Sequence, residues 1–154
     1  MSSLGLSLSK FTRKSTDFPK SWNHPTDIYQ VIQKNPDTHS IVGLLDEQLV
    51  CQIDLILAEA SDLGKHIRVS GKDCVARFLF GNPPIVQQAL ITAFLTWYFE
   101  FPEAGHLYAI PDIQNHNYCR VLESARFVFH CNCILTQQAV SIYRVTNTLF
   151  NATH

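Results

Sequence analysis

The sequence carries little net charge and few charged residues for its length. Lysine and arginine number 12, aspartate and glutamate number 13, and the formal net charge at pH 7 is −1. Proteins that bind nucleic-acid phosphates present a basic surface, so the near-equal numbers of acidic and basic residues argue against nucleic-acid binding. Hydrophobic residues make up 46% of the chain and charged residues 16%, which predicts a packed globule rather than a disordered chain.

Long apolar runs are also missing. The nearest approach to a membrane span is Ile85–Phe101, and Gln87, Thr92 and Glu100 are among the polar residues that interrupt it. The N-terminus has no apolar stretch long enough for a secretory signal. The five cysteines are scattered and odd in number, which favours free thiols in a reducing compartment. We therefore expect a cytoplasmic protein that does not bind membranes.

The first half of the chain shows strand periodicity. Ser40–Leu45 and Gln48–Ala58 are predicted as strands joined by a tight turn, because apolar residues alternate along the second of them. Asp54 falls on the more polar face of that strand, where solvation or hydrogen bonding explains it more simply than catalysis does. Cys74–Phe80 is a third strand, which Gly81-Asn82-Pro83-Pro84 ends.

The second half alternates between helix and strand. Ile85–Phe99 is predicted as the longest helix, followed by a buried strand at His106–Ile110 and a helix that Asn115 caps. Phe127–Leu135 and Ala139–Val145 form a closing hairpin. Strands followed by alternating helices and strands predict an α/β or α+β layered fold with one domain.

The two ends of the chain lack a sustained period. Residues 1–25 are predicted as a partly disordered arm, residues 26–147 as the domain, and residues 148–154 as a frayed tail. A short helix at Asp27–Lys34, ended by Asn35-Pro36, opens the predicted domain.

Ile110–Phe127, with the sequence IPDIQNHNYCRVLESARF, reads as a strand end, a polar turn and an amphipathic helix. The turn and helix alone fit an ordinary capped helix. They also resemble the GNAT acyltransferase core, where a proline–acid–x–x–Asn turn precedes a helix ending in Gly-Phe; Arg126 stands in the glycine's place. The segments GLLDEQLVCQIDLILAEASDLGKH, KDCVARFLFGNPP, WYFEFPEAG and LTQQAVSIYR extend the resemblance over about residues 38–145. They are similar to the siderophore-biosynthesis branch, which makes aerobactin- and mycobactin-type compounds.

The resemblance implies a mixed, mostly antiparallel central sheet flanked by helices. It implies transfer of an acyl group from acetyl-CoA or another acyl-CoA to an amine or hydroxylamine of a small molecule. The pantetheine arm would lie where Val75–Phe80 parts from Leu107–Pro111, and the pyrophosphate at the start of the next helix. Backbone N–H groups near Leu79–Phe80 would polarise the thioester carbonyl. The implied cofactor-binding residues are Leu79, Phe80, Gly81, Asn82, Gln87, Gln88, Ala89, Asn115 and Tyr118. A homodimer is left open.

The catalytic positions depart from the family pattern. The branch uses a His and an Asp, and these fall on Arg77 and Asp112. Arginine has no free lone pair at neutral pH and cannot act as a general base. The GNPP turn has one glycine and two prolines that lack N–H donors, and no lysine or arginine lies between Arg77 and Arg120. We therefore expect weak or absent acyl-CoA binding, with an inactive GNAT-like binding module as the alternative to an enzyme.

Two other groups of residues suggest chemistry. His130, Cys131 and Cys133 include metal-ligand types, but Cys-x-Cys on a strand is tighter than ordinary zinc spacing, so we expect no metal. Cys119 with His116 three residues before it fits a nucleophile and base. A small apolar residue beside a solvated histidine is the simpler interpretation.

Overall fold

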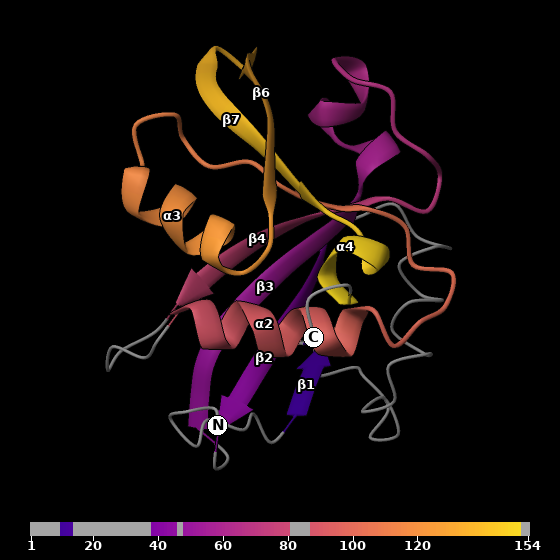
Figure 1. The fold of residues 1–154 in the computed structure, drawn as a ribbon, viewed down its shortest axis with the longest axis vertical. Coiled ribbons are helices and arrows are strands. Elements are labelled where there is room, and N and C mark those ends of the chain that lie inside the picture. Colours follow the sequence, from indigo (N-terminus) through magenta and orange to yellow (C-terminus); the bar gives the residue numbers. More distant parts are fainter. Residues whose placement is uncertain (1–9, 14–37, 46–47, 81–86, 152–154) are drawn as a thin grey trace.

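The computed structural model describes residues 10–13, 38–45, 48–80 and 87–151, and a seven-stranded sheet organises them. The strands lie in the order β1-β2-β3-β4-β5-β7-β6 (Figure 1). Every neighbouring pair is antiparallel except β4 and β5, which are parallel. The strands are β1 (Lys10–Arg13), β2 (His39–Leu45), β3 (Gln48–Leu57), β4 (Cys74–Phe80), β5 (Leu107–Ala109), β6 (Val128–Leu135) and β7 (Gln138–Val145). The predicted single-domain, mixed and mostly antiparallel fold is confirmed.

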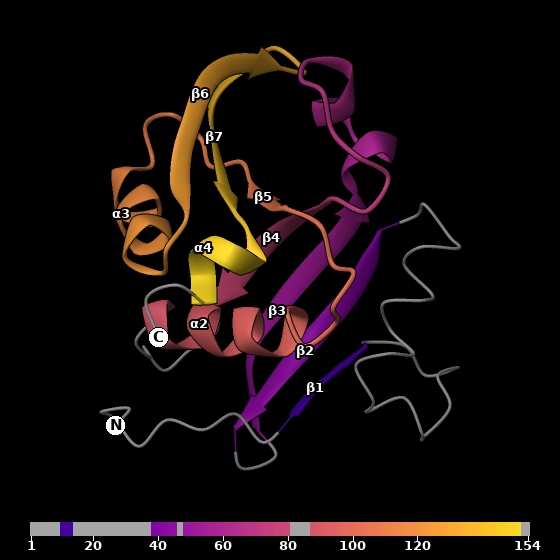
Figure 2. The same ribbon diagram turned by 45° about the vertical axis from the view of Figure 1, so that its right-hand side comes forward.

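One face of the sheet carries the main core. Helices α2 (Gln87–Tyr98), α3 (His116–Ser124) and α4 (Asn147–Asn151) supply side chains to it. Phe94 of α2 and Leu122 of α3 are fully buried there against strand residues such as Phe78. The opposite face carries a smaller cluster around Leu63, where the short 3-10 helices η2 (Ala58–Ala60) and η3 (Asp62–Lys65) cover β5 and β7. Figure 2 shows the helices α2 and α4 on one side of the strands and these short helices on the other.

Strands β4 and β5 stay together for only two residue pairs, Cys74 with Leu107 and Val75 with Tyr108. Beyond Ala109 the chain follows β7 instead: the Ser141 N–H donates to the Pro111 carbonyl at 2.9 Å. Asp112 continues this contact as an isolated bridge to Val140. The strand after Ala109 therefore leaves β4, and the two strands part toward their C-terminal ends.

A buried carboxylate fixes the place where the two strands begin to pair. Asp73 is 2% exposed and accepts hydrogen bonds from the Ser70 N–H, the Ser70 hydroxyl and the His106 N–H. Gly105 lies against it, and a Cβ there would come within 2.5 Å of Asp73 Oδ1 and 2.7 Å of the Lys72 carbonyl. These contacts tie the segment before β4 to the segment before β5.

Most predicted elements are present, with four differences. Lys10–Arg13, inside the predicted arm, is a strand that pairs with β2. The predicted frayed tail instead contains α4, because Phe150 is 2% exposed in the main core. The polar connection after β3 contains η2 and η3. The helical spacing predicts a core stripe of Val86, Leu90, Ala93, Phe94 and Trp97, whereas the buried residues of α2 are Leu90, Ile91, Phe94, Leu95 and Tyr98. The predicted helix at Asp27–Lys34, its Asn35-Pro36 end, the Asp46-Glu47 turn and Val86 lie outside the described residues.

Candidate active site

A cavity of about 740 Å³ lies where β4 parts from the segment after β5. Its wall on β4 includes Ala76 and Phe78, which face the main core, and also Arg77 and Leu79, which face the other side of the sheet. The cavity therefore has access to both faces of the sheet. Its full lining is Val75, Ala76, Arg77, Phe78, Leu79, Phe80, Gln87, Ile110, Pro111, Asp112, Asn115, Asn117, Tyr118 and Gln138.

Backbone groups of β4 point into this cavity. The Cys74 N–H donates to the His106 carbonyl on the β5 side of the strand. Backbone direction alternates along a strand, so Ala76, Phe78 and Phe80 direct their N–H groups to the same side. The Phe78 N–H meets the Tyr118 hydroxyl at 3.4 Å, a long contact that a better acceptor can replace. Beyond the short pairing with β5, the β4 wall of the cavity thus offers the backbone N–H groups of Phe78 and Phe80 as hydrogen-bond donors.

Tyr118 reaches the cavity from the first turn of α3. Asn115 positions it, because the Asn115 side chain accepts the Tyr118 N–H at 3.2 Å and caps the helix as the sequence predicts. Burial raises the pKa of the Tyr118 phenol to about 12. The hydroxyl is therefore protonated at neutral pH and has a hydrogen to donate.

Asp112 lies on the opposite wall with both oxygens engaged. Oδ1 accepts the Gln114 N–H at 2.8 Å, and Oδ2 accepts the Gln138 side-chain amide at 2.6 Å. The Gln114 N–H, and after it the Gln138 amide, lower the pKa of Asp112. This carboxylate is ionised at neutral pH and is a weak proton acceptor.

Arg77 and Asp54 stand directly opposite one another on β4 and β3. Asp54 Oδ1 accepts hydrogen bonds from Ser40 at 2.8 Å, on β2 and so across β3 from Arg77, and from Gln52 at 2.9 Å, on β3 itself. Within the described part of the chain, Asp54 Oδ2 accepts no hydrogen bond and the Arg77 guanidinium makes no ion pair. Opposite charges facing across two strands normally pair, so this site leaves both available to a ligand.

The cavity brings together most of the expected site residues. Arg77, Leu79, Phe80, Gln87, Asp112, Asn115 and Tyr118 all line it. Gln88 and Ala89 do not, and the Gln88 amide instead donates to the Ser124 carbonyl. Gly81 and Asn82 lie outside the described residues. Sequence reasoning missed Gln138, which reaches the wall from the β6–β7 hairpin; no local pattern in the sequence points to it.

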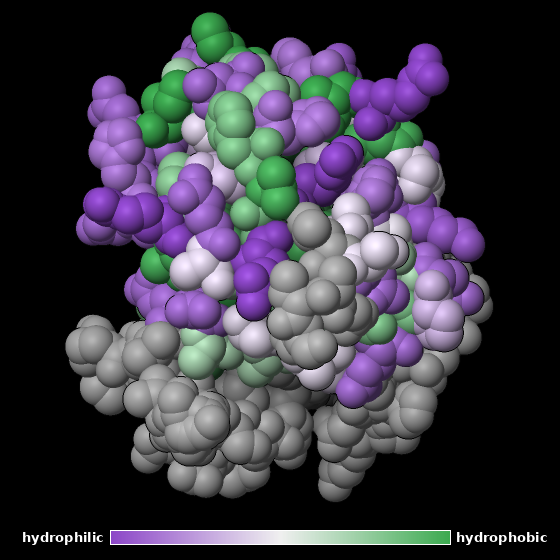
Figure 3. Space-filling model, viewed as in Figure 1, coloured by the Kyte–Doolittle hydropathy of each residue, from purple (hydrophilic) through white to green (hydrophobic). Residues whose placement is uncertain are grey.

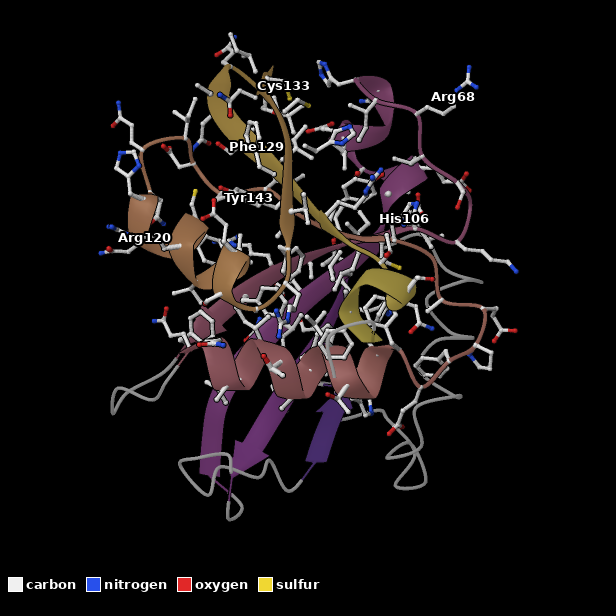
Figure 4. All side chains as sticks on the ribbon, in the orientation of Figure 1. Arg68, His106, Arg120, Phe129, Cys133 and Tyr143 are labelled. Carbon is white, nitrogen blue, oxygen red and sulfur yellow. The ribbon has the colours of Figure 1, made fainter. Side chains whose placement is uncertain are left out.

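A second hollow of about 500 Å³ lies on the other side of α3 and includes Cys119 and His116. Among its lining residues, the Tyr143 hydroxyl donates a hydrogen bond to Glu123 Oε2 at 2.6 Å. Burial, and then the Glu123 carboxylate, raise the pKa of Tyr143. Arg120 points outward from the same helix, away from the cavity between β4 and β5 (Figure 4).

The described residues show neither a metal-ion cluster nor a membrane-spanning helix. Nowhere in them do three or more His, Cys, Asp or Glu side chains group in a way that could hold a metal ion. Across the same ranges, none of the helices has the length and apolar character needed to cross a bilayer.

Residues 12–135 match the model of the acetyltransferase (GNAT) domain family. Because the match spans most of the sequence, the chain belongs to the GNAT acetyltransferase domain family. No curated protein matches the sequence.

Solved structures share the fold at low identity. An aminoglycoside acetyltransferase, AAC(6')-Ib, solved with coenzyme A and kanamycin, is 15% identical with a TM-score of 0.69, covering 80% of this chain and 74% of its own. SpeG spermidine N-acetyltransferase from Vibrio cholerae is 13% identical with a TM-score of 0.59, covering 88% and 80%. N-acetyltransferase PseH from Campylobacter jejuni, with acetyl coenzyme A, is 15% identical with a TM-score of 0.55, covering 79% and 76%. At these identities the likeness concerns the fold.

Proposed function

We propose that this protein transfers an acetyl or other acyl group from acyl-CoA to an amine or hydroxylamine of a small molecule. The observation that carries the proposal is the cavity between the parting strands, where the β4 wall has backbone N–H donors that β5 does not pair with. Because β4 lines it with side chains from both faces, donor and acceptor can meet there from opposite sides of the sheet.

The acyl-CoA donor fits the part of the cavity that faces the main core. The backbone of Phe78 and Phe80 can pair with the amides of a pantetheine arm as an added strand would, and their N–H groups can stabilise negative charge on the thioester oxygen. Gln87 opens α2 beside the cavity, and we propose that the first turn of this helix, with Gln88 and Ala89, faces the diphosphate. Gly81 and Asn82 complete the proposed donor site.

The reaction needs no covalent enzyme intermediate. The acceptor nitrogen attacks the thioester carbon, the C–N bond forms, the C–S bond breaks, and the thiolate leaves. Tyr118 can supply the proton that the thiolate takes, because its phenol is protonated at neutral pH. Asp112 is ionised, so we propose that it stabilises the positive charge that develops on the attacking nitrogen. That nitrogen then loses its proton to water, and the Tyr118 phenolate takes a proton back from water.

Arg77 and Asp54 support a finer proposal about the acceptor. Arg77 cannot act as the base, but its guanidinium can bind a carboxylate on the acceptor, and the unused Asp54 oxygen can bind a second ammonium group. An amine or hydroxylamine derived from an amino acid has this arrangement of charges. We therefore propose an acceptor of the kind acylated in siderophore biosynthesis.

The second candidate is a GNAT-like module that binds a ligand or partner without catalysis. It is favoured by the two prolines of the GNPP turn and by Arg77 in the expected histidine position. Each lost charge-assisted phosphate hydrogen bond is worth roughly 1.5–3 kcal/mol. Losing two weakens acyl-CoA binding by about two to four orders of magnitude.

Calorimetry with acetyl-CoA, followed by a thiol-release assay with a panel of small amines, tests the proposal. We expect sub-millimolar donor binding by the wild type and tighter binding by Arg77→His if the guanidinium obstructs the thioester position. Binding together with thiol release supports the enzyme. Binding without release from any amine favours the module, and no binding at millimolar acetyl-CoA would rule out both donor site and transferase.

A further inference from the structure

Strand β6 lies at the edge of the sheet and lacks the features that normally protect an edge. Among the described strands only β7 pairs with it. Its eight residues, VFHCNCIL, include no Lys, Arg, Asp, Glu or Pro, whereas exposed edges are usually short, charged or interrupted by proline. The opposite edge strand, β1, has four residues, of which Lys10 and Arg13 are cationic. The irregularity in β6 falls between Phe129 and Cys131, so its second half is a regular strand.

The backbone of β6 has unused hydrogen-bonding groups along its outer side. Leu135 pairs with Gln138 across a two-residue turn formed by Thr136 and Gln137, both with positive φ. The residues that flank such a turn bond to each other, and the direction then alternates along the strand. The N–H and C=O groups of Asn132 and Ile134 therefore point away from β7.

Apolar side chains are exposed on the same strand. Val128 is 52% exposed, Phe129 49% and Ile134 65%, and the other exposed large hydrophobic residue of the described chain, Leu79, lines the cavity. Phe129 packs edge-on against Tyr143, with ring centroids 5.7 Å apart, and Figure 4 shows the two side by side. Figure 3 shows hydrophobic residues gathered at the surface over the β6–β7 hairpin.

We propose that β6 pairs antiparallel with β6 of a second copy of this chain. A two-fold axis near Asn132, in the middle of the strand, brings the Ile134 end of each copy to the Val128–Phe129 end of the other. In this register Ile134 of each copy faces His130 of the other, next to Phe129, and Leu135 faces Phe129, so apolar contacts form toward both ends of the strand, as an isologous contact requires. The strand has no charged residue, so no like charges meet across the axis. This self-complementary pattern favours a second copy over a different protein.

The proposed contact is small, because it involves one strand and its flanking side chains. Interfaces of this size are at the weak end of specific association, so we expect a dimer that dissociates on dilution through the micromolar range. It is also separate from the proposed acyl-transfer site, because β5 and β7 lie between β4 and β6 in the sheet. Substitutions that abolish acyl-CoA binding should therefore leave dimer formation intact, and substitutions that abolish dimer formation should leave acyl-CoA binding intact.

Sedimentation over a dilution series, combined with residue-resolved hydrogen exchange, tests the proposal. We expect the wild type to shift from dimer to monomer on dilution, and the amides of Asn132 and Ile134 to lose protection in step with it. The amides of Cys131 and Cys133, which face β7, serve as the internal reference. Ile134→Asp should be monomeric at every concentration with an unchanged melting temperature, because the side chain it replaces is mostly exposed.

Ala60→Asp is the matched control, since it adds the same charge at an exposed position on η2. It should dissociate on dilution as the wild type does. A wild type that is monomeric at high micromolar concentration overturns the proposal. An Ile134→Asp variant that remains dimeric also overturns it, as does equal dissociation of Ile134→Asp and Ala60→Asp. The same holds if the amide protection that changes with dimer formation is confined to a segment other than β6.

Discussion

The two ends of the β4–β5 contact differ in burial, charge and hydrogen bonding. The base is the end where the strands begin to pair, and the mouth is the end where they part at the cavity. At the base, Asp73 is buried and accepts three hydrogen bonds, and Gly105 fits against it with no room for a side chain. At the mouth, Arg77 is exposed without an ion pair in the described chain, and the Phe78 N–H makes only a long contact. The base holds the strands in register, and the mouth leaves groups that a ligand can use.

The difference teaches how one pair of strands can serve stability and binding separately. A buried polar group stabilises only when its partners are in place, so the base has little freedom to change. Groups at the mouth face solvent or a cavity, and changing them costs little folding free energy. Substitutions at the base should therefore change the free energy of unfolding, and substitutions at the mouth should change turnover or ligand affinity.

The largest expected effect is on stability, at the base. Gly105→Ala places a Cβ within 2.5 Å of Asp73 Oδ1 and 2.7 Å of the Lys72 carbonyl, so the two connections must move apart. We expect a loss of about 3 kcal/mol in the free energy of unfolding, measured by urea denaturation. Gly71→Ala is the control, because its nearest atoms are the Glu59 carboxylate at 3.6 Å and beyond. Equal stability of the two variants would show that the base is not rigid.

The next effect is on turnover, at the mouth. Tyr118→Phe removes the phenol proposed to protonate the leaving thiolate, and the rate of thiol release should fall by about 100-fold or more. Stability should fall by at most about 1 kcal/mol, because the hydroxyl makes one long hydrogen bond. Tyr143→Phe, which changes a phenol outside the cavity, should leave the rate within about twofold. A rate loss shared by both variants contradicts the assignment.

A smaller effect is expected at Asp112. Asp112→Asn should lower turnover between about 10- and 100-fold, less than removing a full acid–base group often does. Its pKa is lower in the folded chain than in the unfolded one, so ionised Asp112 stabilises the fold above the unfolded value, and that contribution disappears as pH falls through the folded value. Wild type and variant should therefore differ more in melting temperature at pH 7 than at pH 3. A difference that grows on acidification would be evidence against this linkage.

The smallest effect concerns the acceptor. Asp54→Asn should raise KM for an acceptor that carries a second ammonium group by about tenfold, with kcat and acetyl-CoA affinity unchanged. Glu100→Gln makes the same change of charge at an exposed position after α2 and should leave KM as it is. If KM is unchanged in Asp54→Asn, the acceptor does not contact this carboxylate.

The sequence was informative where local patterns decide structure. The alternation in Gln48–Leu57 and the Asn115 cap each depend on neighbours in the chain, and the structure has both. The tail was predicted as frayed because five helical residues carry no periodic signal, although Phe150 anchors them in the main core. Strand β1 was missed for a similar reason, since only its pairing with β2 identifies it.

The cavity could be predicted in outline but not in its polar detail. The resemblance indicated that β4 and β5 part, and that Asp112, Asn115 and Tyr118 lie there. The sequence does not reveal that Gln138 binds Asp112, or that Asp54 accepts a hydrogen bond from Ser40 on β2. Such contacts join residues far apart in the chain and depend on strand register and side-chain rotamers.

The short strand β5 also has a consequence for how the chain folds. The pairs β2–β3, β3–β4 and β6–β7 join strands that follow one another, whereas β4–β5 and β5–β7 each close around an intervening helix. Local hairpins form quickly, and contacts across long loops form slowly because closing the loop costs chain entropy. Two hairpin-built halves should therefore assemble first and be joined late through the three residues of β5. On this pathway the cavity between β4 and the segment after β5 is the last part of the protein to take shape.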